Sequence, residues 1–197
     1  MRKLDKQKFY KELHSILIKK YGHTGEKIWQ QAADEYDRIM EDAHFRNHKG
    51  AFGIPAAVLY KSLRSFGKNA DMIMQKYGDR KGIQRAKSLR RMTYIPFFED
   101  IAFLNFARIL DFASSEKMGY KRKIVSKPPQ MYGVDIISCP MHEVCKELGE
   151  EKAVLCICHM DKNMSKGYRK LDFQRRTAIP EGAEYCEYRV RKKAKTV

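Results

Sequence analysis

Apolar residues recur at helical spacing through the first part of this chain, and that pattern stops near Gly119. Leu13 and Leu17 are four positions apart, and Ile28 and Ala32 repeat the interval. Side chains at such intervals lie on one face of an α-helix. The chain before Gly119 is therefore predicted to be mainly helical, with each helix burying one face.

Strand-like patterns follow a break at residues 127–129, Lys-Pro-Pro. Residues 131–137 are typical of a strand, and residues 171–179 and 185–190 alternate roughly between apolar and polar side chains. Turn residues at 180–183, Pro-Glu-Gly-Ala, predict that the last two segments form an antiparallel hairpin. The expected fold class is α+β, with a helical N-terminal half packed on a small antiparallel sheet formed mainly by the C-terminal third.

The length of 197 residues fits a single domain over 1–197. Its parts differ in character: mainly helical at 1–118, α+β and cysteine-rich at 119–190, and a basic tail at 191–197.

A helix is predicted from residue 26 to about residue 48, with Thr24 as a plausible N-cap. Residues 95–107 are apolar nearly all round, which predicts a buried helix beginning near Pro96. Residues 151–160 are apolar and ambiguous between helix and strand.

The formal net charge is +16, which favours an anionic partner: a carboxylate or phosphate ligand, nucleic acid or an acidic protein surface. The basic stretch at 76–91 is not accompanied by a helix-turn-helix, zinc-finger or RNA-recognition motif. We interpret it as a solvated helix face or loop, and nucleic acid is the less favoured partner. A small anionic molecule is the preferred one.

A run of about 18 apolar residues would be needed to span a membrane, and none occurs, which argues against a membrane partner. The basic N-terminus is not followed by the apolar stretch of a signal peptide. A cytoplasmic location is therefore expected, where thiols stay reduced. The oligomeric state is left open, a homodimer included.

All five cysteines lie between Cys139 and Cys186, and their odd count does not favour a disulfide framework. Cys139 precedes Pro140, which suits the first turn of a helix, so Cys139 is expected at the N-cap. A thiol there can have a lowered pKa and become a nucleophile. His142 and Cys145 follow at helical intervals and could supply a base or metal ligands; a capping residue, a surface histidine and a core cysteine are the alternative.

Cys156, Cys158, His159 and Asp161 form a second group. On a helix, Cys158 and Asp161 would share one face and could enter one pocket, with Asp161 as a general base. The alternative is an ordinary helix C-terminus. Cys139, Cys145, Cys158 and Cys186 could also complete a zinc site, although tight Cys-x-x-Cys pairs are missing; otherwise no cofactor is expected.

Arg175, Arg176 and Thr177 lie on a predicted strand, so one arginine must face each side. The inward arginine could clamp a carboxylate, with a contact from the threonine hydroxyl. The alternative is an edge strand protected by charge.

The C-terminal third resembles the L-2-amino-thiazoline-4-carboxylic acid hydrolase family. The resemblance rests on Cys139-Pro140, on Leu155-Cys156 followed by Cys158-x-x-Asp161, on Arg175-Arg176-Thr177, and on the Gly182 to Tyr188 strand. That strand carries Tyr188 where phenylalanine is common in the family. More distantly, the chain is similar to 4-vinyl-reductase-type small-molecule-binding domains.

This resemblance implies hydrolysis of 2-amino-thiazoline-4-carboxylate to N-carbamoyl-cysteine, or opening of a related cyclic amidine. Residue chemistry then offers Asp161 or His159 as the base, Cys139 as an alternative covalent nucleophile, and Arg175 or Arg176 for the substrate carboxylate. A non-catalytic binding or sensing module of the 4-vinyl-reductase type, with structural or redox-responsive cysteines, is the alternative function.

Overall fold

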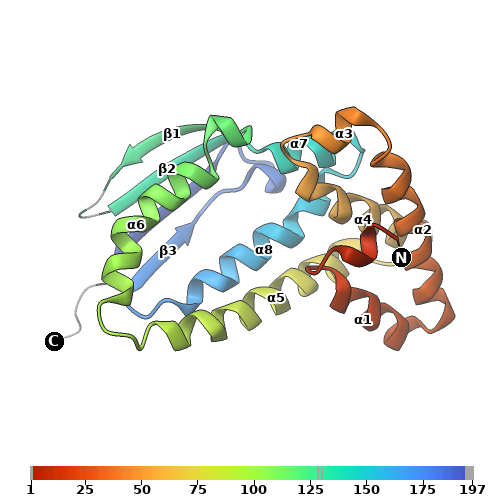
Figure 1. Ribbon diagram of the computed structural model, residues 1–197, viewed down its shortest axis with the longest axis horizontal. Coiled ribbons are helices and arrows are strands. Elements are labelled where there is room, and N and C mark those ends of the chain that lie inside the picture. Colours follow the sequence, from red (N-terminus) through yellow and green to blue (C-terminus); the bar gives the residue numbers. More distant parts are fainter. Residues whose placement is uncertain (1, 128, 130, 194–197) are drawn as a thin grey trace. The chain divides into compact units, whose positions relative to one another are not determined.

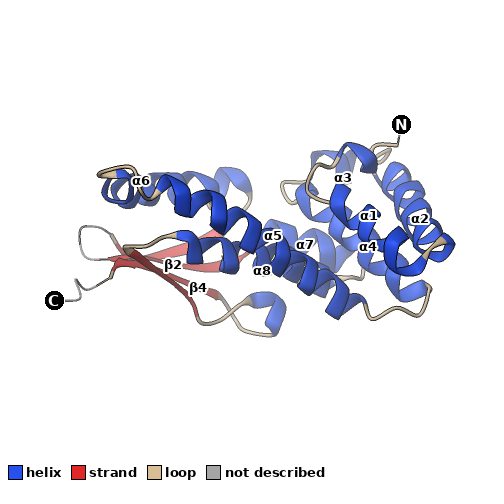
Figure 2. Ribbon diagram, turned by 90° about the horizontal axis from the view of Figure 1, so that it is seen from below, coloured by secondary structure: helices blue, strands red, loops and turns tan. Residues whose placement is uncertain are grey.

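The computed structural model describes residues 2–127, 129 and 131–193, with Phe106 and Ala107 described by their backbone alone. Helices and one antiparallel sheet make up the fold, so the predicted α+β class is confirmed (Figures 1 and 2). The chain divides into two compact units. The first comprises Met1–Tyr77 and Met141–Cys156, and the second comprises Gly78–Pro140 and Ile157–Val197.

The elements follow one another along the chain. The helices are α1 (Lys11–Tyr21), α2 (His23–Ile39), α3 (Ala43–Asn47), α4 (Ile54–Ser65), α5 (Ala70–Met92), α6 (Phe98–Ala113), α7 (Pro140–Glu147) and α8 (Leu155–Met164). Two short 3₁₀ turns, η5 (Ser165–Gly167) and η6 (Ile179–Glu181), lie before and after β3 in the chain. The strands are β1 (Lys121–Ser126), β2 (Met131–Ser138), β3 (Leu171–Arg175) and β4 (Cys186–Lys192).

The first unit is a helical bundle whose apolar stripes meet as the spacing predicted. Leu13, Leu17, Ile28 and Ala32 are all buried in its core. The helix predicted over residues 26–48 is wrong in two respects. Gly22, not Thr24, occupies the N-cap position of α2. Helix α2 also ends at Ile39 instead of continuing to residue 48. A separate helix, α3, begins at Ala43, where the carboxylate of Asp42 caps it by accepting a hydrogen bond from the backbone N–H of His44 at 2.8 Å.

The sheet of the second unit has the strand order β1-β2-β4-β3, with every neighbouring pair antiparallel. Tyr188 of β4 lies directly opposite Val134 on one side and Arg175 on the other. Directly opposed residues share a face of the sheet, and so do residues two apart on a strand. Cys186 and Val190 therefore lie on the same face as Arg175, and this is the face that carries the core cluster.

Helix α6 lies along the core face of the sheet (Figure 2). Phe103 is fully buried against Tyr132 and Val134, whereas Leu104, one residue further, is 60% exposed. The expectation of a helix buried all round is therefore wrong. A single helix rests on a sheet through one stripe only, and the opposite stripe of α6 exposes apolar residues: Ile101, Leu104, Ile109 and Phe112.

The segment left ambiguous at 151–160 is helical, a 3₁₀ turn followed by α8. The segment α8–η5 packs closely on α5, and a glycine occurs at two of the contact points, Gly82 on α5 and Gly167 on η5. A Cβ atom on Gly82 would lie 2.5 Å from the carbonyl oxygen of Met160, and one on Gly167 would lie 2.6 Å from that of Ala86. This close approach fixes how α8, which carries Asp161, lies in the second unit.

Most of the basic stretch at 76–91 lies on exposed surface of α5, as expected for a solvated helix face. The predicted basic tail begins later than expected, because Arg191 and Lys192 pair within β4. Residues 194–197 lie outside the described residues. Among the described helices, none is both long and apolar enough to cross a membrane.

Phe103 and Leu104 provide a matched test of this packing. Phe103→Ala should lower the free energy of unfolding by about 3–5 kcal/mol, because it leaves a cavity between α6 and the sheet. Leu104→Ala should change it by less than about 0.5 kcal/mol. Urea denaturation of both variants measures the difference. Equal losses would contradict the placement of α6.

Candidate active site

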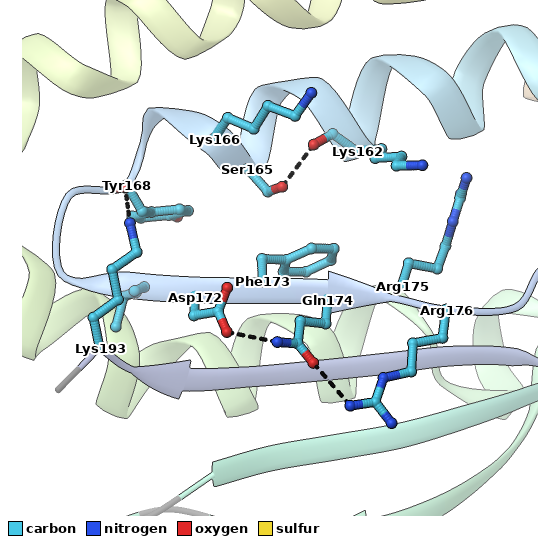
Figure 3. A pocket seen from close by; sticks show the side chains of 11 residues that line it. Lys162, Ser165, Lys166, Tyr168, Asp172, Phe173, Gln174, Arg175, Arg176 and Lys193 are labelled. Carbon is cyan, nitrogen blue, oxygen red and sulfur yellow. Dashed lines mark hydrogen bonds between the residues drawn. The ribbon is translucent and has the colours of Figure 1, made fainter.

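Arg175 ends β3 and carries a cationic side chain on the core face of the sheet. Figure 3 shows this side chain reaching from β3 toward α8. Its Nη1 atom is buried and has no hydrogen-bond partner among the described residues. The guanidinium interacts electrostatically with Cys158 and Tyr188. A buried donor without an acceptor is costly in a folded protein, so this atom is a candidate for contact with a bound anion.

Helix α8 presents Cys158 and Asp161 toward Arg175, one helical turn apart. Burial raises the pKa of the Cys158 thiol to about 12, against the opposing influence of Arg175. Cys158 is therefore a neutral thiol at physiological pH. It can line a binding site but is not a thiolate nucleophile there.

Burial also raises the pKa of the Asp161 carboxyl, to about 6, although the positive charges of Arg175 and Arg85 act in the opposite direction. In the described part of the chain, no salt bridge joins Asp161 to Arg175. A carboxyl group with this pKa is mostly ionised at neutral pH and still basic enough to accept a proton from water. Perturbed carboxyl groups of this kind are frequent at functional sites.

Cys139 lies between β2 and α7, directly before Pro140, as the sequence predicted for the N-cap position. Its half-buried side chain packs against the core cluster that contains Cys186. It also interacts electrostatically with Tyr120, whose pKa is raised chiefly by burial and further by Cys139. The structure thus brings Cys139, Cys158 and Cys186 into the same part of the second unit as Asp161 and Arg175.

His159 points away from this cluster. Its Nδ1 atom lies 2.9 Å from the Oδ1 atom of Asp79 on α5, and the same carboxylate accepts a hydrogen bond from Asn163. Since α8 is helical, His159 and Asp161 lie on different faces of it. The two bases that the sequence offered are therefore separated, and only Asp161 faces Arg175.

Arg176 and Thr177 also lie outside the cluster. The predicted strand 171–179 is too long, because β3 ends at Arg175 and Arg176 follows it. The side chain of Arg176 is directed to the opposite side from that of Arg175, and its guanidinium lies 3.4 Å from the side-chain oxygen of Gln174 (Figure 3). The Thr177 hydroxyl donates to the carbonyl oxygen of Tyr185 at 2.8 Å and accepts from the N–H of Glu187 at 3.2 Å. These bonds hold together the chain segments that lead out of β3 and into β4.

The remaining cysteines, Cys145 and Cys156, are buried in the first unit, where both interact electrostatically with Tyr10. The five cysteines are therefore divided between the two units. Within the described residues, there is no group of three or more histidine, cysteine, aspartate or glutamate side chains that could hold a metal ion.

A groove of about 540 Å³ lies between α8–η5 and β3 (Figure 3). Arg175 is part of its lining. The other cationic lining residues are Lys162, Lys166, Arg176 and Lys193. Alternation along the last strand predicts that Tyr188 shares a face with Cys186, and the register of the sheet agrees. The sequence did not point to the lysines or to Tyr120 beside the cluster, because no local signal marks them.

Asp161 gives a stability prediction with a definite sign. Its pKa is higher in the folded protein than in the unfolded chain, so the stability it contributes is present below about pH 4 and is lost as the pH rises through about 6. Asp161→Asn, which cannot ionise, should therefore be more stable than the wild type by about 1–3 kcal/mol at about pH 8. Urea denaturation of the wild type and the variant at about pH 4 and at about pH 8 tests this. A variant that is less stable than the wild type at about pH 8 would contradict the conclusion that burial makes the charge of Asp161 unfavourable.

Comparison with known proteins gives one family match. The family model described as L-2-amino-thiazoline-4-carboxylic acid hydrolase matches residues 44–190. No curated protein matches the chain. Among solved structures, the crystal structure of an H-NOX protein from S. oneidensis in the Fe(II)NO ligation state is similar, with a TM-score of 0.44, 7% sequence identity, and coverage of 98% of this chain and 100% of that chain. The family match covers most of the sequence, including the Cys158-x-x-Asp161 segment and Arg175, and this chain belongs to the L-2-amino-thiazoline-4-carboxylic acid hydrolase family.

Proposed function

We propose that this protein hydrolyses 2-amino-thiazoline-4-carboxylate, or a related cyclic amidine that carries a carboxylate, with Asp161 as general base and Arg175 as the carboxylate clamp. One observation carries the proposal. The partly buried guanidinium of Arg175, whose buried Nη1 atom has no hydrogen-bond partner among the described residues, lies within electrostatic reach of the partly buried carboxyl group of Asp161, and no salt bridge joins these two described residues. Membership of this family supports a hydrolase function.

The reaction needs water to add to the ring carbon that lies between nitrogen and sulfur. Asp161 accepts a proton from this water as the oxygen bonds to the carbon, and the ring nitrogen gains a proton. Collapse of the tetrahedral intermediate then forms the carbonyl and breaks the carbon–sulfur bond, and the sulfur takes the hydroxyl proton. One water is consumed and N-carbamoyl-cysteine is released. A single carboxyl group with a pKa near 6 can relay both protons.

Arg175 suits the carboxylate of such a substrate. A guanidinium can hold a carboxylate through two parallel hydrogen bonds, and these are stronger in a site from which water is excluded. Binding through the carboxylate would hold the ring at a fixed position relative to Asp161, which supplies much of the advantage of a positioned base. Cys158, a neutral thiol, would line the site.

Ring opening followed by mass spectrometry tests the proposal, with 2-amino-thiazoline-4-carboxylate as the substrate. Below about pH 6, kcat/KM should rise with pH as Asp161 ionises, and it should level off above that pH. Asp161→Asn should lower kcat by about 10²–10⁴-fold above about pH 7, where the wild-type carboxyl group is ionised, and should remove the rise of kcat/KM with pH. Tight binding of the substrate without turnover would contradict the enzyme proposal and favour the binding module.

The two neighbouring arginines form a matched pair of variants. Arg175→Gln should raise KM by about tenfold or more, because it removes the charged donor. It should also move the midpoint of the pH profile above 6, because Arg175 favours the ionised form of Asp161. Arg176→Gln, on the other side of the strand, should leave both quantities nearly unchanged. Equal effects of the two variants would refute the assignment of Arg175.

Cys139→Ala separates the general-base route from covalent catalysis. With Asp161 as the base, this variant should keep its activity within about tenfold of the wild type. Complete loss of activity, together with a mass increase on Cys139 of the wild type during turnover, would assign the attack on the ring to this thiol.

A further inference from the structure

Strand β3 lies at one edge of the described sheet, next to β4 alone. The backbone N–H of Lys193 donates to the carbonyl oxygen of Lys170 at 2.7 Å, just before β3 begins. Main-chain groups alternate in direction along an antiparallel strand. The backbone N–H and C=O groups of Asp172 and Gln174 are therefore directed toward β4, whereas those of Leu171 and Arg175 are directed away from it.

The groove described above follows this edge. Its lining includes every residue from Leu171 to Arg176, so the groove runs along the strand rather than entering the sheet at one point. The facing wall is formed by Lys162, Ser165 and Lys166, on α8 and η5. A groove between an edge strand and a helix is the setting in which domains of other folds bind an extended peptide as an additional strand.

The charges around the groove select the kind of peptide. Its described lining contains five cationic side chains and one carboxylate, Asp172, which already forms an ion pair with Arg191 at 3.2 Å. Lys162, Lys166, Arg176 and Lys193 are all exposed. Cationic residues can protect an edge strand from pairing with other copies. The same residues attract an extended chain of opposite charge.

Other occupants fit these charges poorly. A second copy of the chain would bring the same cationic edge to a protein whose net charge is +16. The last residues of this chain, 194–197, add a lysine and no acidic residue. The two edges of the described sheet also differ in regularity. The pairing of β1 with β2 has two register shifts, whereas β3 pairs with β4 over five residues without one, so β3 is the more regular edge for an additional strand.

We propose that the groove between α8–η5 and β3 binds an extended acidic segment of a partner protein, which pairs with the main chain of Leu171 and Arg175 as an additional strand. The segment would direct its carboxylates at the lysines of α8–η5 and at Arg176. Main-chain pairing would supply the geometry, and charge would supply the selectivity.

A blocked peptide of repeated Glu-Glu-Val-Val, which places glutamates on both faces of an added strand, is mixed with the full-length protein and tests the proposal by fluorescence anisotropy and hydrogen exchange. The peptide should bind, and it should slow exchange of the Leu171 and Arg175 amides. The double variant Lys166→Glu/Arg176→Glu should bind it at least about tenfold more weakly, because both charges become repulsive. Lys123→Glu, an equal change of charge on the exposed surface of β1, is the control and should bind it within about twofold of the wild type.

A second peptide separates strand pairing from attraction between charges. The same sequence with alternate amides N-methylated keeps every carboxylate but loses main-chain donors. It should bind at least about tenfold more weakly than the unmodified peptide. Equal binding of the two peptides, an equal loss in the Lys123→Glu control, unchanged exchange at Leu171 and Arg175, or no binding of the acidic peptide would each overturn the proposal.

Discussion

The placement of one charge, the guanidinium of Arg175, on the core face of the sheet is the constraint on which the candidate site depends. A charge that is partly withdrawn from water without a full set of partners is unfavourable, and the fold tolerates this one because Asp161 and Tyr188 lie near it. These groups moderate the charge without neutralising it, since Nη1 remains without a partner among the described residues. The same arrangement that lowers stability leaves a donor ready for an anionic substrate.

Asp161 shows the same relation, in which an arrangement that lowers stability suits the residue to its proposed function. Burial makes its ionised form unfavourable and thereby raises its proton affinity into the range in which a base works near neutral pH. Its position follows from the close packing of α8 on α5 at Gly82, which aims one face of α8 at the sheet and the other, with His159, at Asp79. Packing therefore decides which of two nearby bases faces Arg175.

The local pattern of the sequence was sufficient to predict the α+β class, the position of Cys139 directly before a helix that begins at Pro140, and the antiparallel pairing of the last two strands. It did not distinguish Arg175 from Arg176, because the inward face of β3 is set by its register against Tyr188, a contact distant in sequence. The exposed apolar stripe of α6 was also not predicted, because apolar composition alone does not show how much of a helix surface a sheet can bury.

Titration of the aspartate carboxyl carbons by ¹³C NMR tests the central claim most directly, with the Asp161 signal assigned by its absence in Asp161→Asn. The account predicts that Asp161 titrates with a pKa of about 6 in the wild type and with a higher value in Arg175→Gln, because Arg175 favours the ionised form. A pKa near the ordinary aspartate value, unchanged by the loss of Arg175, would show that the two groups do not form one buried site.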